Sequence, residues 1–222
     1  MVELRRTLEA LRRAGLTCKR AKCCFGKRSL EFLGHEIGGG RVSVPAARVA
    51  AIRAHPLPKT RKQLRAFLVL VGFYRRFIAG FHQWSSVLTP HTSTAMSGVV
   101  SWTKPMLNAF YELCNKLCES ICLCVPCSSD IFVLESDASS SGVGAVLSVV
   151  HQDEKLPMAF FSKQLRGSQL NYSGQELEGL GIYEAISHFA YYLYGHRFTV
   201  VTDHKGLVNM REGRQENRCI YN

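Results

Sequence analysis

Apolar residues recur with the spacing of an α-helix along the first part of the chain. Leu4, Leu8 and Leu11 stand four and three positions apart, which predicts a helix over residues 3–14 that ends at the following glycine. A short helix is predicted over residues 45–54, because two prolines follow it closely and a helix does not continue through proline.

Longer helices are predicted further along. Thr60 and Gln63 have the form of a capping box, and apolar residues then recur at helical spacing as far as Ile78, so we expect a helix over residues 61–78. Another helix is predicted over residues 105–119. A third follows near residue 180, with an inward stripe made of Ile182, Ala185, Ile186, Phe189, Ala190 and Leu193.

Strand patterns lie between these helices. Residues 30–37 alternate and run into three consecutive glycines, after which residues 41–44 alternate again, so a hairpin is expected there. Short apolar runs bounded by turn residues predict further strands at residues 131–134, 143–150, 158–162 and 198–201. Strands that alternate with helices indicate an α/β class.

Three carboxylates stand out by position in the last hundred residues. Asp137 lies just past one predicted strand, and Asp203 lies just past another. Glu178 precedes the inward stripe of its helix by four and seven positions, so it projects with the stripe toward the sheet. Glu176 is two residues away, about 200° around the helix, and projects elsewhere.

Converging carboxylates predict a site for divalent cations. A carboxylate that faces a core without a partner costs several kcal/mol or becomes neutral. Mg²⁺ or Mn²⁺ prefers hard oxygen ligands, and two such ions about 4 Å apart can activate water and stabilise the leaving oxygen of a phosphodiester. The alternative is that each acid caps a strand or helix end at the surface.

Charge is divided unevenly along the 222 residues. Residues 1–100 carry 18 Lys and Arg but only 4 Asp and Glu, whereas residues 101–222 carry 10 basic and 13 acidic residues. A basic half joined to a mildly acidic half indicates one part that holds a polyanion and another that gathers carboxylates. A solvated basic surface without a partner is the alternative.

The nine cysteines are expected to be thiols, because no secretory signal is present. Cys124 and Cys127 form the one pair with zinc-ligand spacing, and no second pair follows at a suitable interval. We therefore favour small apolar side chains over a structural zinc site. The longest apolar run has seven residues, too few to cross a bilayer, and a cytoplasmic or nuclear location is expected.

Several segments resemble the Pol polyproteins of gypsy-type long-terminal-repeat (LTR) retrotransposons. Three segments resemble the ribonuclease H domain of that family: FVLESDASSSGVGAVL (132–147), FFSKQL (160–165) and NYSGQELEGLGIYEAISHFAYYLYGHRFTVVTDHKGL (171–207). One segment resembles the connecting region between the reverse transcriptase and ribonuclease H domains: WTKPMLNAFYELCNKL (102–117). Two segments resemble the end of the reverse transcriptase palm and its thumb: LRRAGLTCKRAKCCFGKRSLEFLGHEI (11–37) and PLPKTRKQLRAFLVLVGFYRRFI (56–78).

The resemblance implies an order of domains. The palm end and thumb would occupy residues 1–90, the connection 91–127 and a ribonuclease H-like domain 128–210, with an unmatched tail over 211–222. The expected fold is α/β, with an α+β thumb and connection followed by a mixed β-sheet with helices that is shortened at its C-terminal end. Other parts of a Pol polyprotein are expected partners.

The resemblance also implies functional residues. The family's catalytic and metal-binding acids fall on Asp137, Glu178 and Asp203, with Mg²⁺ or Mn²⁺ as cofactor and an RNA·DNA hybrid or duplex nucleic acid as partner. Nucleic-acid contacts are implied at two places, a hairpin that holds the primer end and a thumb helix that lies along the minor groove. The residues concerned are Phe32, Leu33, Gly34, His35, Lys62, Arg65, Arg75 and Arg76.

The chain departs from the family pattern at several points. It has no Tyr-x-Asp-Asp tetrapeptide, so no polymerase active site is expected. The residues after the Thr-Asp-His motif match no further strand or acid of the family. Val69 stands where glycine is usual in the thumb helix, and would obstruct a close approach to a duplex. Gly179 stands where leucine is usual, and should weaken the helix and its packing.

Three functions stay open from the sequence. The first is hydrolysis of the RNA strand of RNA·DNA hybrids by a two-metal ribonuclease H-like hydrolase. The second is nucleic-acid binding through phosphates without catalysis. The third is a translated relic of a retroelement that folds poorly.

Overall fold

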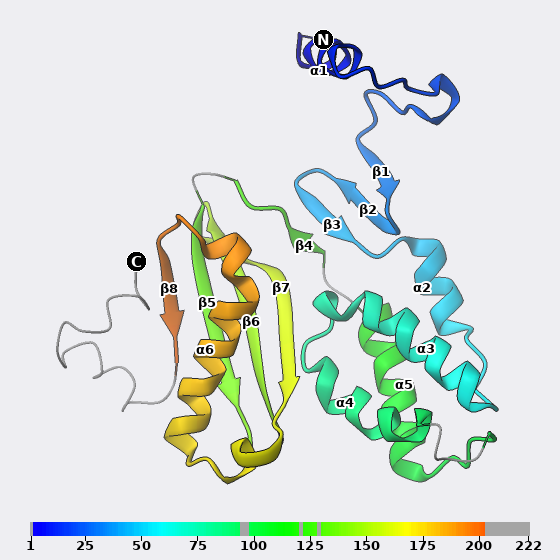
Figure 1. The fold of residues 1–222 in the computed structure, drawn as a ribbon, viewed down its shortest axis with the longest axis vertical. Helices are drawn as coiled ribbons and strands as arrows, with labels where there is room; N and C mark the ends of the chain where they lie inside the picture. The colour runs from blue at the N-terminus through cyan, green and yellow to red at the C-terminus, as the bar shows by residue number, and fades with distance from the viewer. Residues whose placement is uncertain (1, 94–97, 120–121, 128–129, 203–222) are drawn as a thin grey trace, which may run out of the picture.

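The computed structural model describes residues 2–93, 98–119, 122–127 and 130–202 (Figure 1). The α-helices of these residues are α1 (Val2–Arg13), α2 (Ala46–Arg53), α3 (Arg61–Phe73), α4 (Phe81–Leu88), α5 (Lys104–Cys118) and α6 (Gly174–Leu193). The strands are β1 (Ser29–Phe32), β2 (His35–Gly38), β3 (Arg41–Ser43), β4 (Leu123–Cys124), β5 (Ile131–Ala138), β6 (Gly142–His151), β7 (Glu154–Gln164) and β8 (Phe198–Val201). The predicted α/β class is therefore confirmed.

The strands form two four-stranded sheets. The first has the order β1-β2-β3-β4 and is antiparallel throughout. The second has the order β7-β6-β5-β8, in which β5, β6 and β7 form an antiparallel meander and β8 lies parallel to β5. A parallel pair needs a crossover connection, and α6 lies within that connection (Figure 1).

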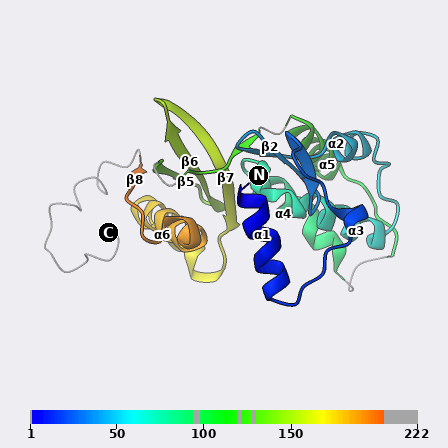
Figure 2. The ribbon, with the colours of Figure 1, turned by 90° about the horizontal axis from the view of Figure 1, so that it is seen from above.

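Helix α6 covers one face of the second sheet, as Figure 2 shows from above. Its inward side chains meet apolar side chains that alternate along β5 and β6, which is the arrangement expected of a sheet buried on one face. This core contains Phe132, Leu134, Leu147, Val149, Ala185, Phe189 and Leu193. The predicted inward stripe is confirmed at Ala185, Phe189 and Leu193, whereas Ala190 is exposed.

Helices α2 to α5 enclose a separate core. The Thr60–Gln63 capping box is present at the start of α3, as predicted, and the helix buries Leu64, Phe67 and Val71. The Phe67 ring lies 4.5 Å from the ring of Phe110 on α5. Each of these side chains is at most 2% exposed, so the helical half has a core of its own.

The two halves meet at β7. The backbone N–H of His82 on α4 donates to the Ser162 hydroxyl at 3.0 Å, and the guanidinium of Arg75 donates to the Ser162 carbonyl at 2.9 Å. Phe160, also on β7, packs against the core of the helical half. One strand of the second sheet is thus held by both polar and apolar contacts from the first half.

The first hairpin differs from the sequence prediction. Residues 30–37 form two strands rather than one, because the chain reverses at Leu33 and Gly34, where φ is +48° and +77°. Positive φ at two successive positions is the geometry of a tight two-residue hairpin turn. The hairpin that the family resemblance implied at Phe32–His35 is therefore present, and a second reversal at Gly39–Gly40 leads into β3.

The predicted helix over residues 61–78 is too long. Helix α3 ends at Phe73, and Arg75–Phe77 form a 3₁₀ helix, η2. In a 3₁₀ helix residues three apart lie on one side, so Tyr74 and Phe77 are buried together, each at 2% exposure. Gly72, one position before the end of α3, is a local signal for this change, and the burial of the two rings accompanies it.

Helix α4 was not predicted, although its sequence carries a signal. Phe81, Trp84, Ser85 and Leu88 stand at helical spacing, and Phe81, Ser85 and Leu88 are buried. The residue before the helix, Gly80, has φ of +64°, a conformation that glycine adopts without steric cost.

Gly179 does not weaken packing in the way the sequence suggested. A Cβ atom placed there would meet no heavy atom within 4 Å. A missing side chain therefore leaves open space at the surface of α6 rather than a cavity in its core. The remaining cost of Gly179 is its low helix propensity.

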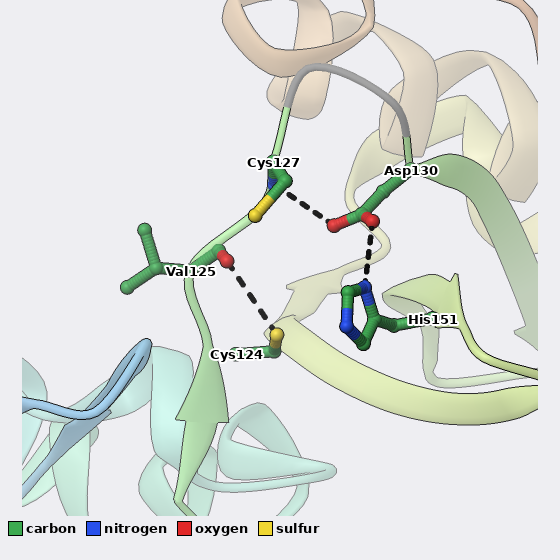
Figure 3. A network of polar contacts seen from close by, with 5 residues as sticks. All are labelled: Cys124, Val125, Cys127, Asp130 and His151. Atoms are coloured by element: carbon green, nitrogen blue, oxygen red, sulfur yellow. Dashed lines mark hydrogen bonds and ion pairs between the residues drawn. The ribbon is translucent and has the colours of Figure 1, made fainter.

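A polar network lies beside β4, where the chain leads into the second sheet (Figure 3). One carboxylate oxygen of Asp130 accepts from the Cys127 backbone N–H at 2.8 Å, and the other lies 3.0 Å from Nδ1 of His151. The Cys124 thiol points to the Val125 carbonyl instead. The hydrogen bonds from Cys127 and His151 lower the pKa of Asp130, so Asp130 favours its charged form where the chain enters β5.

We expect this carboxylate to make stability depend on acid. A carboxyl group whose pKa is lowered in the folded state stabilises the protein above its unfolded pKa, and loses that contribution as pH falls through the folded pKa. Asp130→Asn should therefore lower the free energy of unfolding at pH 7 and have a smaller effect near pH 3. Urea unfolding at both pH values measures this, with Asp153→Asn in the exposed β6–β7 turn as control. An equal loss at both pH values would contradict it.

Candidate active site and nucleic-acid interface

The first predicted acid, Asp137, lies inside a strand rather than past its end. Strand β5 extends to Ala138, four residues beyond the predicted end at Leu134. Asp137 pairs with Gly144 of β6. The Asp137 side chain is exposed and alternates with buried Ser136. It lines a small cavity of about 230 Å³ together with Ala79 and Gly80.

The second acid, Glu178, is buried as predicted. A capping box between Ser173 and Glu176 starts helix α6 and leaves Glu176 exposed, whereas Glu178 is 9% exposed. The Oε1 atom of Glu178 accepts a hydrogen bond from the backbone N–H of Ala138 at 3.3 Å. The carboxylate of Glu178 therefore lies at the end of β5, next to the residue that follows Asp137.

Helix α6 fits closely against this strand end. The position of a Cβ atom on Gly181 would lie 3.8 Å from Ala138 and Val143, which is ordinary van der Waals contact. Helix α6 therefore crosses β5 and β6 at a distance that a small residue fills, and Glu178 lies about one turn earlier on the same helix.

The third acid, Asp203, lies outside the described residues, one position beyond their end at Thr202. The last registered pair between the parallel strands joins Glu135 to Val201. Within the residues that the structure describes, no group of three or more His, Cys, Asp or Glu side chains is arranged to hold a metal ion.

The turn between β1 and β2 lies against the end of α3. The hydroxyl of Tyr74 donates to the Gly34 carbonyl at 2.9 Å, and the His35 ring stacks on Phe73 with 5.1 Å between ring centres. Burial and the charge of Arg76 lower the pKa of His35. These contacts fix the turn and leave Leu33 at its tip 76% exposed.

An exposed apolar surface continues from this turn along α3. Val69 is 69% exposed and Phe73 is 54% exposed, one helical turn apart, and Phe32 on the neighbouring hairpin is 55% exposed. Lys62 and Arg65 are exposed at the start of the same helix. We call Leu33, Val69, Phe73 and Lys62 the α3 face.

The four cations expected to contact nucleic acid fall into two groups. Lys62 and Arg65 lie on α3, where Arg65 also donates to the Thr92 carbonyl at 2.7 Å. Arg75 and Arg76 lie on η2, so they do not continue the row along α3. Arg75 turns to β7, and the guanidinium of Arg76 lies over the Phe77 ring at 5.7 Å.

The sequence is similar to known proteins over most of its length. The family described as "RNase H-like domain found in reverse transcriptase" matches residues 102–200, which include Asp137 and Glu178. The Pol polyprotein of transposon 297 from Drosophila melanogaster is 34% identical over 196 residues, 87% of this chain. The chain belongs to the Pol polyproteins of LTR retrotransposons.

Other Pol polyproteins support this relationship. The transposon Tf2-3 polyprotein of Schizosaccharomyces pombe is 31% identical over 220 residues, which is 96% of this chain. The chain spans 18% of the transposon 297 polyprotein and 16% of the Tf2-3 polyprotein, so it corresponds to a limited segment of each.

Solved structures have the same fold at low sequence identity. The foamy viral protease-reverse transcriptase dRH in complex with double-stranded DNA has a TM-score of 0.79 at 19% identity, and covers 95% of this chain and 37% of its own. The foamy viral protease-reverse transcriptase in complex with an RNA/DNA hybrid has a TM-score of 0.71 at 18% identity. The match covers 88% of this chain and 27% of that structure's chain. The retrotransposon Pol segment therefore has the fold of a reverse transcriptase region. No helix among the described residues is long and apolar enough to span a membrane.

The anchoring of the β1–β2 turn in this Pol segment can be tested by one hydroxyl. Tyr74→Phe should lower the free energy of unfolding by about 1 kcal/mol, because the Gly34 carbonyl loses its donor in a buried setting. Urea unfolding measures the change. Tyr111→Phe, at an exposed tyrosine of α5, is the matched control, and the two variants should differ.

Proposed function

We propose that this Pol segment hydrolyses the RNA strand of RNA·DNA hybrids, with Asp137, Glu178 and Asp203 as its acidic residues and Mg²⁺ or Mn²⁺ as cofactor. The observation that carries the proposal is the Glu178 carboxylate, which is buried beneath the sheet yet directed at the end of β5. The hydrogen bond from the Ala138 N–H fixes this carboxylate at the strand end that carries Asp137.

The donor chemistry at this strand end fits a hard divalent cation. Glu178 offers carboxylate oxygens in a buried setting on the α6 side of the sheet, and Asp137, which alternates with Ser136 and Ala138, offers its own on the opposite face at the same strand end. A bound divalent cation would supply charge stabilisation and an activated water at the scissile phosphate. The protein holds the Glu178 carboxylate in place through the Ala138 N–H and the packing of Gly181.

Parallel pairing supports the choice of Asp203 as the third acid. Glu135 and Val201 form the last registered pair of β5 and β8. Asp137 follows Glu135 by two residues, and Asp203 follows Val201 by two residues. The described parts of β5 and β8 run in parallel toward the end of the sheet at which Asp137 lies, and catalytic residues of α/β folds gather at such strand ends.

The division into domains is part of the same proposal. We assign residues 1–90 to the palm end and thumb, 91–127 to the connection, 128–210 to the ribonuclease H-like domain, and 211–222 to a tail. Two separate cores support a boundary near residue 127, since the first core includes Leu123 and the second begins at Phe132.

We further propose that duplex nucleic acid lies along the α3 face. Exposed apolar side chains beside a lysine suit a duplex groove, because the lysine can reach phosphates while the apolar groups contact sugars and base edges. The β1–β2 turn would approach the same duplex through Phe32 and Leu33. Such a protein acts where nucleic acid is found, so we place it in the cytoplasm or nucleus.

Cleavage of a labelled RNA·DNA hybrid tests the catalytic proposal. Purified protein with Mg²⁺ or Mn²⁺ should cut the RNA strand, and Asp137→Asn and Glu178→Gln should each reduce cutting to the rate of a buffer control. The matched control is Glu176→Gln, because glutamine preserves the capping box of α6 and should leave the rate unchanged. Circular dichroism should show that all variants are folded.

Cutting that persists in the Asp137→Asn variant would refute the assignment of this acid. A folded wild-type protein that binds hybrid without cutting it would favour the alternative function, nucleic-acid binding without catalysis. The basic first half and the α3 face are the observations that favour this second candidate. An insoluble product would favour a retroelement relic.

Binding to duplex through phosphates should depend steeply on salt. Lys62→Gln should weaken duplex binding and lower the log–log slope of affinity against salt by about one, as expected when one phosphate contact is lost. Lys104→Gln, at an exposed lysine of α5, should leave the slope unchanged. Fluorescence anisotropy at four salt concentrations measures both slopes, and a wild-type slope near zero would contradict duplex binding through phosphates.

A further inference from the structure

A cleft lies where the helical half meets the second sheet, away from the α3 face and on the α6 side of β7. It has a volume of about 680 Å³ and is lined by side chains of η2, α4, β7 and α6. This volume lies within the range of pockets that hold small ligands, and its lining is rich in polar groups. The residues that build it come from segments about 80 residues apart in the sequence.

Positive charge converges on this cleft from three segments. Arg75 enters from η2, Lys163 from the end of β7, and Arg166 from the residues that follow β7. Glu184 of α6 is the one acidic side chain of the lining, and its carboxylate lies 2.5 Å from the Lys163 ammonium. Two cationic groups therefore remain in excess over the carboxylate of the cleft.

Arg75 is held in a defined orientation. Its guanidinium donates to the Ser162 carbonyl and lies over the Phe81 ring at 5.7 Å. A guanidinium has five N–H donors, so the hydrogen bond to the Ser162 carbonyl leaves further N–H groups that an anion in the cleft could accept from. A preorganised guanidinium loses little side-chain entropy when it binds an anion.

Two histidines line the same cleft, His82 on α4 and His188 on α6. Burial lowers the pKa of both, and the charge of Arg75 lowers each further; Arg166 also acts on His82. The His188 ring stacks on Phe161 with 4.5 Å between ring centres. An anion bound among these groups would raise the pKa of both histidines and draw protons to them.

We propose that this cleft binds a phosphodiester segment of single-stranded nucleic acid that extends beyond the duplex. The arginines and Lys163 would contact phosphate oxygens, and the hydroxyl of Ser187 would donate to them at the rim. The site goes beyond the proposed catalytic function and rests only on nucleic acid being the partner. It assigns Arg75 to this cleft rather than to the α3 face.

A binding titration with matched variants tests the site. A labelled oligothymidylate of about 12 nucleotides should bind the full chain, a length within the range that single-strand sites cover. Arg166→Gln should weaken this binding about fivefold and reduce its salt slope by about one. Arg53→Gln, an arginine on α2 that lies outside the cleft lining, should leave both unchanged. Equal affinities for the two variants would overturn the proposal.

Nuclear magnetic resonance of the histidine rings gives an independent readout. Adding the oligothymidylate should shift the ring signals of His82 and His188 and raise their pKa values, so binding should strengthen as pH falls from about 8 to about 6. The groups that act on these rings are Arg75 and Arg166, and Glu184 lies in the same lining. Unmoved ring signals under saturating oligonucleotide would overturn the proposal.

Inorganic phosphate separates two sources of the same chemistry. Phosphate that competes weakly, while the oligothymidylate binds far more tightly, supports a nucleic-acid site. Phosphate that shifts both histidines while the oligothymidylate leaves them unmoved would mean a small-anion site and overturn the assignment. Hybrid cleavage by the wild-type protein and by Arg166→Gln is measured in parallel, so that the two proposals are tested separately. Absence of cleavage by the wild-type protein would contradict the roles of the acids. Loss of oligothymidylate affinity in Arg166→Gln concerns the cleft alone.

Discussion

The contact of Ser162 with the helical half is the interaction on which the arrangement of the sites depends. Two hydrogen bonds reach this one residue, one from a backbone N–H of α4 and one from the guanidinium of Arg75. Ser162 is 6% exposed, so its two acceptor oxygens are removed from water as the halves meet. Buried polar groups need partners, and these two bonds hold η2 and α4 in one register against β7.

That register has consequences on both sides of the sheet. On the α6 side it creates the cationic cleft, because Arg75 and His82 come to face Lys163 and His188. On the other side it brings Ala79 and Gly80 to the small cavity that Asp137 lines. The helical half of this retrotransposon Pol segment therefore contributes to the surroundings of the acidic residues, although its own core is separate.

The site at the end of β5 is built by a different constraint, the burial of one face of a sheet beneath a single helix. Glu178 projects inward with the apolar stripe of α6, and the Ala138 N–H donates a hydrogen bond to its carboxylate. A central strand with neighbours on both sides has few backbone groups left for side chains, and they occur where the ladder ends. Glu178 reaches β5 at that end.

Periodicity alone determined a large part of this protein. Spacing is enough to predict several features, because the geometry of a helix repeats every 3.6 residues. They are the capping box at the start of α3, helix α5, the buried side of α6 and the choice of Glu178 over Glu176. Local alternation could not find the turn at Leu33, the end of α3 at Phe73 or the extension of β5 through Asp137. The turn depends on a partner distant in the sequence, the Tyr74 hydroxyl. The helix end depends on the burial of the neighbouring rings of Tyr74 and Phe77, and the strand depends on its pairing with β6. The place of Arg75 was likewise decided only by tertiary structure, since a side chain five bonds long takes its direction from the strand that it meets.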